Sequence, residues 1–301
     1  MLIFHDPQCA EFGSSMRPEQ PARVLRSAKY LRATYPNWTW RIPATAVDDA
    51  TLLLAHSPAH LKRLGQTRDF DADTPFLPGI ADHARRSVGA ALEAKRHALV
   101  TGEPVFSLMR PPGHHATRDQ AMGFCYLNQI AVATLAAQRD FESTSTSKPT
   151  VCRVAVWDFD AHHGNGTEAI LLGQPHVLFA SVHQYPGYPG TGTRDLGPNV
   201  RNWSVAPHLS RDSHMAALRA SLDTVQAFAP DLILVSAGFD AYARDPITEM
   251  TLEIEDFATL GRWLGETGRP AAALLEGGYS EDLPLLIAAF LSAWENAQRT
   301  A

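Results

Sequence analysis

Short apolar runs alternate with longer amphipathic segments along most of the chain. The apolar runs predict buried β-strands at residues 2–5, 105–109, 154–157, 177–182, 231–236 and 271–275. Apolar positions at helical spacing predict helices at residues 17–35, 80–100, 128–138, 167–172, 210–228, 254–266 and 282–296, with two short helices within 48–64. Strands that alternate with helices indicate an α/β fold, in which a single open, mostly parallel sheet carries helices on both faces. We expect residues 1–301 to form one such domain.

Three segments break this pattern. Residues 68–79 form a polar, proline-containing stretch, and residues 139–150 are polar and low in sequence complexity. We expect 139–150 to be an exposed loop rather than a domain linker, because the strand pattern resumes directly after it. Residues 184–198 are rich in glycine, proline and tyrosine, and we expect this loop to line the mouth of a site.

The composition narrows the class of protein. At 301 residues and 45% hydrophobic content, the chain has enough apolar residues for a sizeable core. A formal net charge of −6 is the opposite of the basic surface that binds nucleic acid. The three cysteines show no C-x-x-C spacing, which argues against a disulfide framework and against a cysteine-type zinc site. With no secretion signal and no apolar stretch of membrane-spanning length, we expect a cytoplasmic protein without membrane contact.

The most informative stretch is 154–166, where an apolar strand ends in Asp158, Asp160 and His162. The two-residue period of a strand points these three side chains to one side. Carboxylate oxygen and imidazole nitrogen are ligands that suit zinc or another borderline divalent ion. Taken alone, the pattern is equally typical of a strand that ends in a polar turn.

Polar side chains follow three other predicted strands. His114 and His115 come after a proline-rich turn, Asp240 closes the strand at 231–236, and Tyr279 follows a Glu-Gly-Gly turn. Each has an ordinary explanation as a loop residue, a helix cap or a core aromatic. Because the carboxyl ends of parallel strands lie along one edge of a sheet, the four clusters together favour an active site there.

With these clusters, the chain resembles the histone deacetylase family, which has an arginase-like open α/β fold. The motifs that carry the resemblance are Arg-Pro-Pro-Gly-His-His (110–115), Gly-Phe-Cys-Tyr-Leu-Asn (123–128), Asp-Phe-Asp-Ala-His-His-Gly-Asn-Gly (158–166), Ser-Ala-Gly-Phe-Asp (236–240) and Glu-Gly-Gly-Tyr (276–279). They span nearly the whole chain. Asn165 and the Glu-Gly-Gly-Tyr form resemble the class II and bacterial amidohydrolase branches more than class I.

The resemblance implies a catalytic metal site. Asp160, His162 and Asp240 match the family's zinc ligands, and three protein ligands leave coordination open for water and a substrate carbonyl. The same ligands leave Fe²⁺ open as the metal in the cell. A structural potassium ion is also implied at positions that match Asp158, Asp160, His162, Ser181 and Val182.

The resemblance also implies the catalytic groups. It pairs Asp158 with His114 and Asn165 with His115, so that the ionised partner favours a charged His114 while His115 remains a neutral base. We expect His115 to accept a proton from zinc-activated water and Tyr279 to stabilise the oxyanion.

A narrow substrate tunnel follows from the same resemblance. Gly123, Phe124 and Tyr188 match the residues that line it, and two aromatic walls suit the methylene chain of an acylated amine.

The chain departs from the family near the entrance. It has Arg17-Pro18-Glu19 where relatives commonly have His-Pro-Glu, and residues 68–79 leave no room for the long insertion of bacterial acetylpolyamine amidohydrolases. Ile247 stands where vertebrate polyamine deacetylases carry a gatekeeping glutamate. The last two differences favour acyl-lysine over polyamines as the substrate.

Other functions remain open at this stage. The main alternative is an amidohydrolase of acetylpolyamines or other small acylated amines, which would use the same catalytic residues. An arginase-type ureohydrolase with two manganese ions needs further carboxylates, but Asn165 and Tyr242 stand where they would be expected. An inactive acyl-lysine-binding module would lack a ligand or a catalytic residue, and none is missing. Nothing in the sequence indicates an oligomeric state.

Overall fold

The computed structural model describes residues 1–144 and 152–300. Its strands are β1 (Leu2–Phe4), β2 (Thr39–Arg41), β3 (Val105–Ser107), β4 (Val154–Asp158), β5 (Val177–Gln184), β6 (Val200–Val205), β7 (Leu232–Ala237) and β8 (Ala271–Leu275). Its helices are the short 3₁₀ turn η1 (Pro7–Ala10), α1 (Ala22–Thr34), α2 (Asp49–Leu52), α3 (Pro58–Leu64), α4 (Ile80–Thr101), α5 (Gln129–Thr144), α6 (Asn165–Leu171), α7 (Arg211–Ala227), α8 (Ile254–Glu266) and α9 (Leu283–Gln298).

One sheet contains all eight of these strands, in the order β2-β1-β3-β8-β7-β4-β5-β6. Every neighbouring pair is parallel, which confirms the open α/β class expected from the sequence. Strands β3 and β4 are consecutive in the chain but not adjacent in the sheet, because β8 and β7 lie between them. The strand order therefore changes direction at the centre of the sheet, where α/β proteins bind their ligands.

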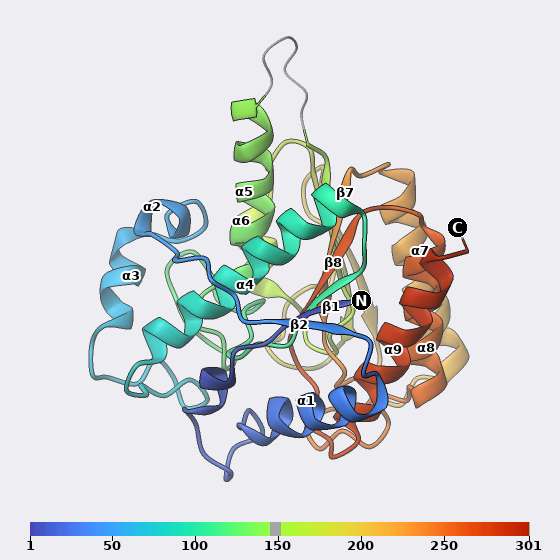
Figure 1. Cartoon of the computed structure of the whole chain (residues 1–301), viewed down its shortest axis with the longest axis horizontal. Coiled ribbons are helices and arrows are strands. Elements are labelled where there is room, and N and C mark those ends of the chain that lie inside the picture. Colours follow the sequence, from blue (N-terminus) through green and yellow to red (C-terminus); the bar gives the residue numbers. More distant parts are fainter. Residues whose placement is uncertain (145–151, 301) are drawn as a thin grey trace.

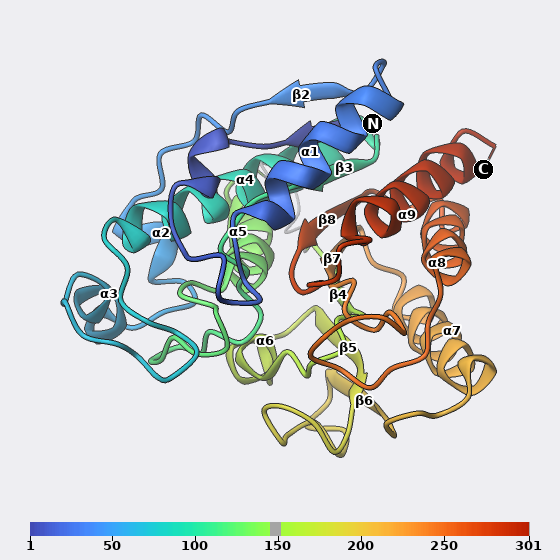
Figure 2. The same ribbon diagram turned by 90° about the horizontal axis from the view of Figure 1, so that it is seen from below.

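Helices cover both faces of the sheet (Figures 1 and 2). In Figure 1, α4 and α5 lie on one side of the central strands, while α8 and α9 lie on the other. The pair α4 and α5 pack together, and α9 contacts both α8 and α1. Because both faces are covered, β4, β7 and β8 are buried at every position and read as continuous apolar runs.

An aromatic cluster packs against the loops that follow β4 and β7. Phe159, which follows β4, and Phe239, which follows β7, both pack against Phe290 of α9, with ring centroids 5.4 and 6.0 Å away. Each phenylalanine directly precedes an aspartate of the predicted metal site. Burial of these rings against α9 anchors the two turns that carry Asp160 and Asp240.

The two edge strands were not predicted from the sequence. Strand β2 is largely exposed and β6 is buried only at its ends, so neither contains a continuous apolar run. Pairing with β1 and β5 makes them strands, and such pairing is not visible in a local pattern.

Two predicted helix boundaries were wrong. Helix α1 begins at Ala22 rather than at residue 17, because a helix from residue 17 would place Pro21 in its interior, where proline has no N–H to donate and clashes with the preceding turn. Residues 139–144, predicted to be an exposed loop, continue helix α5 to Thr144. The remainder of that predicted loop lies outside the described residues. Among the described helices, none is both long and apolar enough to cross a membrane.

Candidate metal centre and active site

The loops that follow four adjacent strands, β3, β8, β7 and β4, meet at one edge of the sheet. They carry the His114–His115 pair, Tyr279, Asp240 and the Asp158–His162 turn, respectively. The four clusters predicted from separate stretches of sequence therefore lie at neighbouring strand ends.

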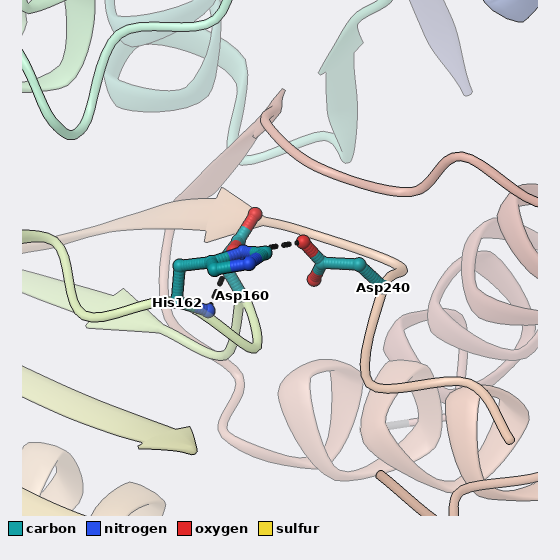
Figure 3. Close-up of side chains that lie close together, drawn as sticks. All are labelled: Asp160, His162 and Asp240. Carbon is teal, nitrogen blue, oxygen red and sulfur yellow. Dashed lines mark hydrogen bonds and ion pairs between the residues drawn. The ribbon is translucent and has the colours of Figure 1, made fainter. Parts of the chain in front are cut away.

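Asp160, His162 and Asp240 form a compact three-ligand cluster (Figure 3). One ligand atom from each residue lies within 4.8 Å of the others. The Nδ1 atom of His162 is 2.9 Å from Oδ2 of Asp240 and 3.2 Å from Oδ1 of Asp160. Both carboxylates are completely buried. Two buried carboxylates and one imidazole are a donor set that fits Zn²⁺ or a similar divalent ion.

The two buried carboxylates of the cluster favour a positive charge beside them. Burial by itself lowers the pKa of His162, but Asp240 and Asp160 more than offset burial and raise this pKa to about 10. Burial raises the pKa of Asp160, whereas the imidazoliums of His114 and His162 bring it below its usual value. In the metal-free protein a proton on His162 thus supplies charge that a bound cation would supply instead.

Backbone amides hold the two carboxylates in place. The N–H of Gly277 donates to Oδ2 of Asp160 at 2.6 Å, and the N–H of Ala161 donates to Oδ1 of Asp240 at 2.8 Å. A Cβ atom at Gly277 or Gly238 would collide with the Asp160 carboxylate, so only glycine fits at these two positions. The turns after β7 and β8 are therefore shaped around the acidic ligands.

The two histidines have different partners. Nδ1 of His114 lies 3.1 Å from Oδ2 of Asp158, and Nδ1 of His115 lies 2.8 Å from Oδ1 of Asn165. Burial alone lowers the pKa of His114, but Asp160 and Asp158 more than offset it and raise this pKa to about 10. Burial and the charges of His114 and His162 lower the pKa of His115 well below 6.5. His115 is thus neutral at pH 7, while His114 is protonated.

Glu276 is a buried acid beneath the histidine loop whose contribution sequence reasoning missed. Its Oε2 atom accepts hydrogen bonds from the N–H groups of Gly113, at 2.7 Å, and His114, at 3.2 Å. Burial raises its pKa to about 7. One local feature could have indicated this role. Glu276 stands directly between an apolar strand and two glycines, and an acid that immediately follows a buried strand is itself expected to be buried.

Tyr279 is held from two sides by residues that sequence reasoning also missed. Its N–H donates to Oδ2 of Asp245 at 2.7 Å, and the Arg23 guanidinium lies 4.7 Å from the centre of its ring. Burial raises the pKa of the phenol well above 10, so the hydroxyl remains a proton donor. Neither Asp245 nor Arg23 carries a local signal that links it to a tyrosine elsewhere in the chain.

A cavity of about 340 Å³ leads to these groups. Its lining comprises Arg17, Pro18, Asp73, His115, Gly123, Phe124, His162, Tyr188, Ile247 and Tyr279. The rings of Tyr188 and His115 meet edge to face at 5.1 Å, and those of Phe124 and Tyr279 at 5.8 Å. All three residues expected in the tunnel, Gly123, Phe124 and Tyr188, line this cavity. Tyr188 belongs to the loop that we expected at a site mouth.

Gly123 allows the side chains of His115 and Tyr188 to lie close to the backbone at the cavity. A Cβ atom there would lie 2.6 Å from Cδ2 of His115 and 2.9 Å from Cε1 of Tyr188. Gly123 and Phe124 both have positive φ, of 55° and 68°, which is a rare backbone for phenylalanine. This turn presents the Phe124 ring to the cavity.

Of the residues expected at a potassium site, Asp160 and His162 belong to the metal cluster, while Asp158 lies at the end of β4 and Ser181 and Val182 lie on β5. Ser181 and Val182 are buried on β5, and Ser181 is directly paired with Asp158 of β4 in the sheet register. The Ser181 hydroxyl is 2.9 Å from Nδ1 of His183. A potassium ion at this position stays a prediction.

Comparisons with known proteins agree with this geometry. The profile of the histone deacetylase domain matches residues 17–293. A histone deacetylase-like amidohydrolase from Pseudomonas aeruginosa is 37% identical over 260 residues, which cover 79% of this chain and 66% of the relative. Acetylpolyamine amidohydrolase 2 from the same organism is 32% identical, with 93% and 84% covered.

A crystal structure of an acetylpolyamine aminohydrolase from Burkholderia pseudomallei superposes with a TM-score of 0.82. It shares 26% sequence identity, and the match covers 99% of both chains. The profile match and the relatives both extend over most of the sequence, and the fold agrees throughout. The chain therefore belongs to the histone deacetylase family of deacetylases and amidohydrolases.

Proposed function

We propose that this protein is a zinc-dependent deacylase that hydrolyses the amide bond of acetyl-lysine or another short acyl-lysine side chain. The observation that carries the proposal is that three kinds of group face one cavity: a metal-ligand residue, a neutral histidine and a protonated tyrosine. The cavity's aromatic walls suit the methylene stem of lysine.

Asp160, His162 and Asp240 would hold the metal. When bound there, Zn²⁺ supplies Lewis-acid polarisation of the substrate carbonyl and lowers the pKa of water.

His115 is the proposed general base. Its Nδ1–H donates to Oδ1 of Asn165, which leaves the Nε2 lone pair free. Because the pKa of His115 is low, the lone pair is available at pH 7 to take a proton from the attacking water. The same nitrogen then returns the proton to the leaving amine. The protonated His114 beside it contributes fixed positive charge as negative charge develops on the substrate.

Tyr279 is the proposed hydrogen-bond donor to the oxyanion. Its phenol stays protonated, and Asp245 fixes its backbone, so the hydroxyl needs little reorganisation during the reaction. Water, base and donor then act on one carbonyl at the closed end of the cavity.

The second candidate substrate class is acetylpolyamines or other small acylated amines. Relatives named acetylpolyamine amidohydrolases favour this class. Ile247 at the cavity favours acyl-lysine instead, because an apolar side chain stands at the position where an acidic one would bind an internal ammonium.

Parallel kinetics would test the proposal. Purified protein with its metal quantified should hydrolyse an acetyl-lysine substrate with a higher kcat/KM than N-acetylputrescine, at about one zinc per chain. A preference for N-acetylputrescine would transfer the function to the second class and leave the catalytic assignment intact. Metal-replete protein that cleaves neither substrate would contradict the proposed function.

We also propose a structural K⁺ near Asp158 and Ser181, supported by their pairing in the sheet and their complete burial. K⁺ should raise the melting temperature more than Na⁺ at equal ionic strength.

A further inference from the structure

Arg17 places an unpaired positive charge at the mouth of the active-site cavity. Its Nη1 atom donates weak hydrogen bonds to the backbone carbonyls of Ala72, at 3.2 Å, and Asp73, at 3.4 Å. Among the described residues, its Nε and Nη2 groups make no hydrogen bond and its guanidinium makes no ion pair. Arg17 lines the same cavity as His162 and Tyr279, so these donors are available to a ligand.

Asp73 adds an unpaired negative charge to the same mouth. Its side chain is exposed, and no ion pair between described residues includes its carboxylate. Its backbone N–H donates to Oδ1 of Asp71 at 3.0 Å, which helps to fix the loop. Arg17 therefore contacts the backbone oxygen of Asp73 while the two opposite charges remain apart. A ligand with both charges would satisfy each of them.

We propose that this mouth selects acylated amines whose far end is a zwitterion, such as free Nε-acetyl-lysine. The inference rests on the proposed function, because the acyl group must reach the metal centre for the far end to meet the mouth. The guanidinium of Arg17 binds the α-carboxylate, and the carboxylate of Asp73 binds the α-ammonium. An acetylpolyamine has only positive charges at its far end. Asp73 attracts such a charge, but Arg17 repels it and is left without an anionic partner, so the polyamine satisfies one of the two contacts.

Four substrates separate the two contacts. They are free Nε-acetyl-lysine, its Nα-blocked acid, its carboxamide with a free α-amine, and the compound blocked at both ends. Wild-type protein should show a kcat/KM about fivefold or more higher for the free acid than for the matching carboxamide. The free α-amine should give a similar advantage over the Nα-blocked form.

Variants assign each preference to its residue. Arg17→Gln should bring the acid-to-amide ratio close to one, and Arg17→Lys should restore part of it. Asp73→Asn should remove the preference for the free amine and leave the backbone contact with Arg17 in place. Arg63→Ala is the matched control, because Arg63 also bonds carbonyls of this loop, those of Arg68 and Asp69, but does not line the cavity. It should change neither ratio.

The outcomes distinguish the inference from the proposed function. Equal kcat/KM on all four substrates, or ratios that Arg17→Gln does not change, would overturn the zwitterion site and leave the deacylase standing. A kcat/KM on an internal acetyl-lysine peptide with a neighbouring glutamate that exceeds the value on free Nε-acetyl-lysine would also overturn it. In that peptide the carboxylate belongs to a side chain, and no free α-carboxylate is present. Failure of wild-type protein on every substrate would overturn the deacylase itself.

Discussion

His114 and His115 are neighbours in the chain, yet their imidazoles have opposite protonation states. Both are buried, and burial alone lowers both pKa values. The difference comes from their surroundings: carboxylates surround His114, whereas His115 faces the neutral amide of Asn165 and two cationic histidines. Environment, and not residue type, thus separates a fixed charge from a proton acceptor.

The partner of His115 can be changed by one substitution. Asn165→Asp places a carboxylate beside Nδ1 and should raise the pKa of His115. More of the base is then protonated at a given pH, so the acidic limb of the kcat/KM profile should move up by about one pH unit or more. The measurement is kcat/KM against pH at constant zinc occupancy. An unchanged acidic limb would exclude His115 as the base.

Loss of the Tyr279 hydroxyl should affect turnover without affecting the metal. Tyr279→Phe is expected to lower kcat by about 10²–10³, because one oxyanion donor is removed. Zinc content should stay at the wild-type level, since Tyr279 is not part of the ligand cluster. Steady-state kinetics with metal analysis of the same preparation would check both, and wild-type turnover would contradict the assigned role.

At the scale of elements, a buried ion network joins α1 to the turn after β3. Glu19 accepts from Nη2 of Arg110 at 2.6 Å and from Nη1 of Arg23 at 3.2 Å. The Arg23 Nε atom donates to the carbonyl of Gly278 at 2.7 Å, directly before Tyr279. The network therefore connects the start of α1, the histidine loop and the tyrosine turn.

Breaking this network should destabilise the protein. Glu19→Gln leaves two buried arginines without their carboxylate, and we expect the free energy of unfolding to fall by about 3 kcal/mol. Urea unfolding at pH 7 measures the change. Glu281→Gln is the matched control, since its pair with Arg26 is exposed and should contribute nothing measurable. Equal effects of the two variants would contradict the role of the buried network.

The stabilising effect of Glu19 should also depend on pH. Burial alone raises the pKa of Glu19, but Arg110 and Arg23 more than offset it, so the folded-state pKa lies below 4.5. A depressed carboxyl pKa stabilises the fold at higher pH, and this contribution is lost as the pH falls through the folded-state value. The stability difference between wild type and Glu19→Gln should therefore be constant above about pH 5 and narrow in acid.

At the scale of the whole molecule, the proposed metal site joins loops that follow the central strands β4 and β7. A ligand that binds only the folded state stabilises it, by about 4 kcal/mol at a thousand times its Kd. Removal of zinc with a chelator should thus lower the melting temperature, and added Zn²⁺ should restore it. Because His162 must lose a proton before it binds metal, zinc affinity should fall as the pH falls. Calorimetry at several pH values would test this, and a pH-independent affinity would contradict the ligand assignment.

The sequence by itself determined the central elements and the chemistry that they carry. Strands β4, β7 and β8 are buried on both faces, so each must be a continuous apolar run, and the polar residues after them are visible as breaks in that run. Asp160, His162, Asp240 and Tyr279 follow from this local pattern. Their place in one site followed from the shared edge of a parallel sheet, and the role of each residue came from the resemblance to a family.

Only the tertiary structure decided what surrounds these groups. The edge strands β2 and β6, the loop that precedes α1, and the contacts of Glu276, Asp245 and Arg23 with the active site all depend on segments far apart in the chain. The same is true of Arg17 and Asp73, which meet at the cavity although 56 positions separate them. A local pattern records how a residue is buried, but not which distant backbone or charge lies beside it.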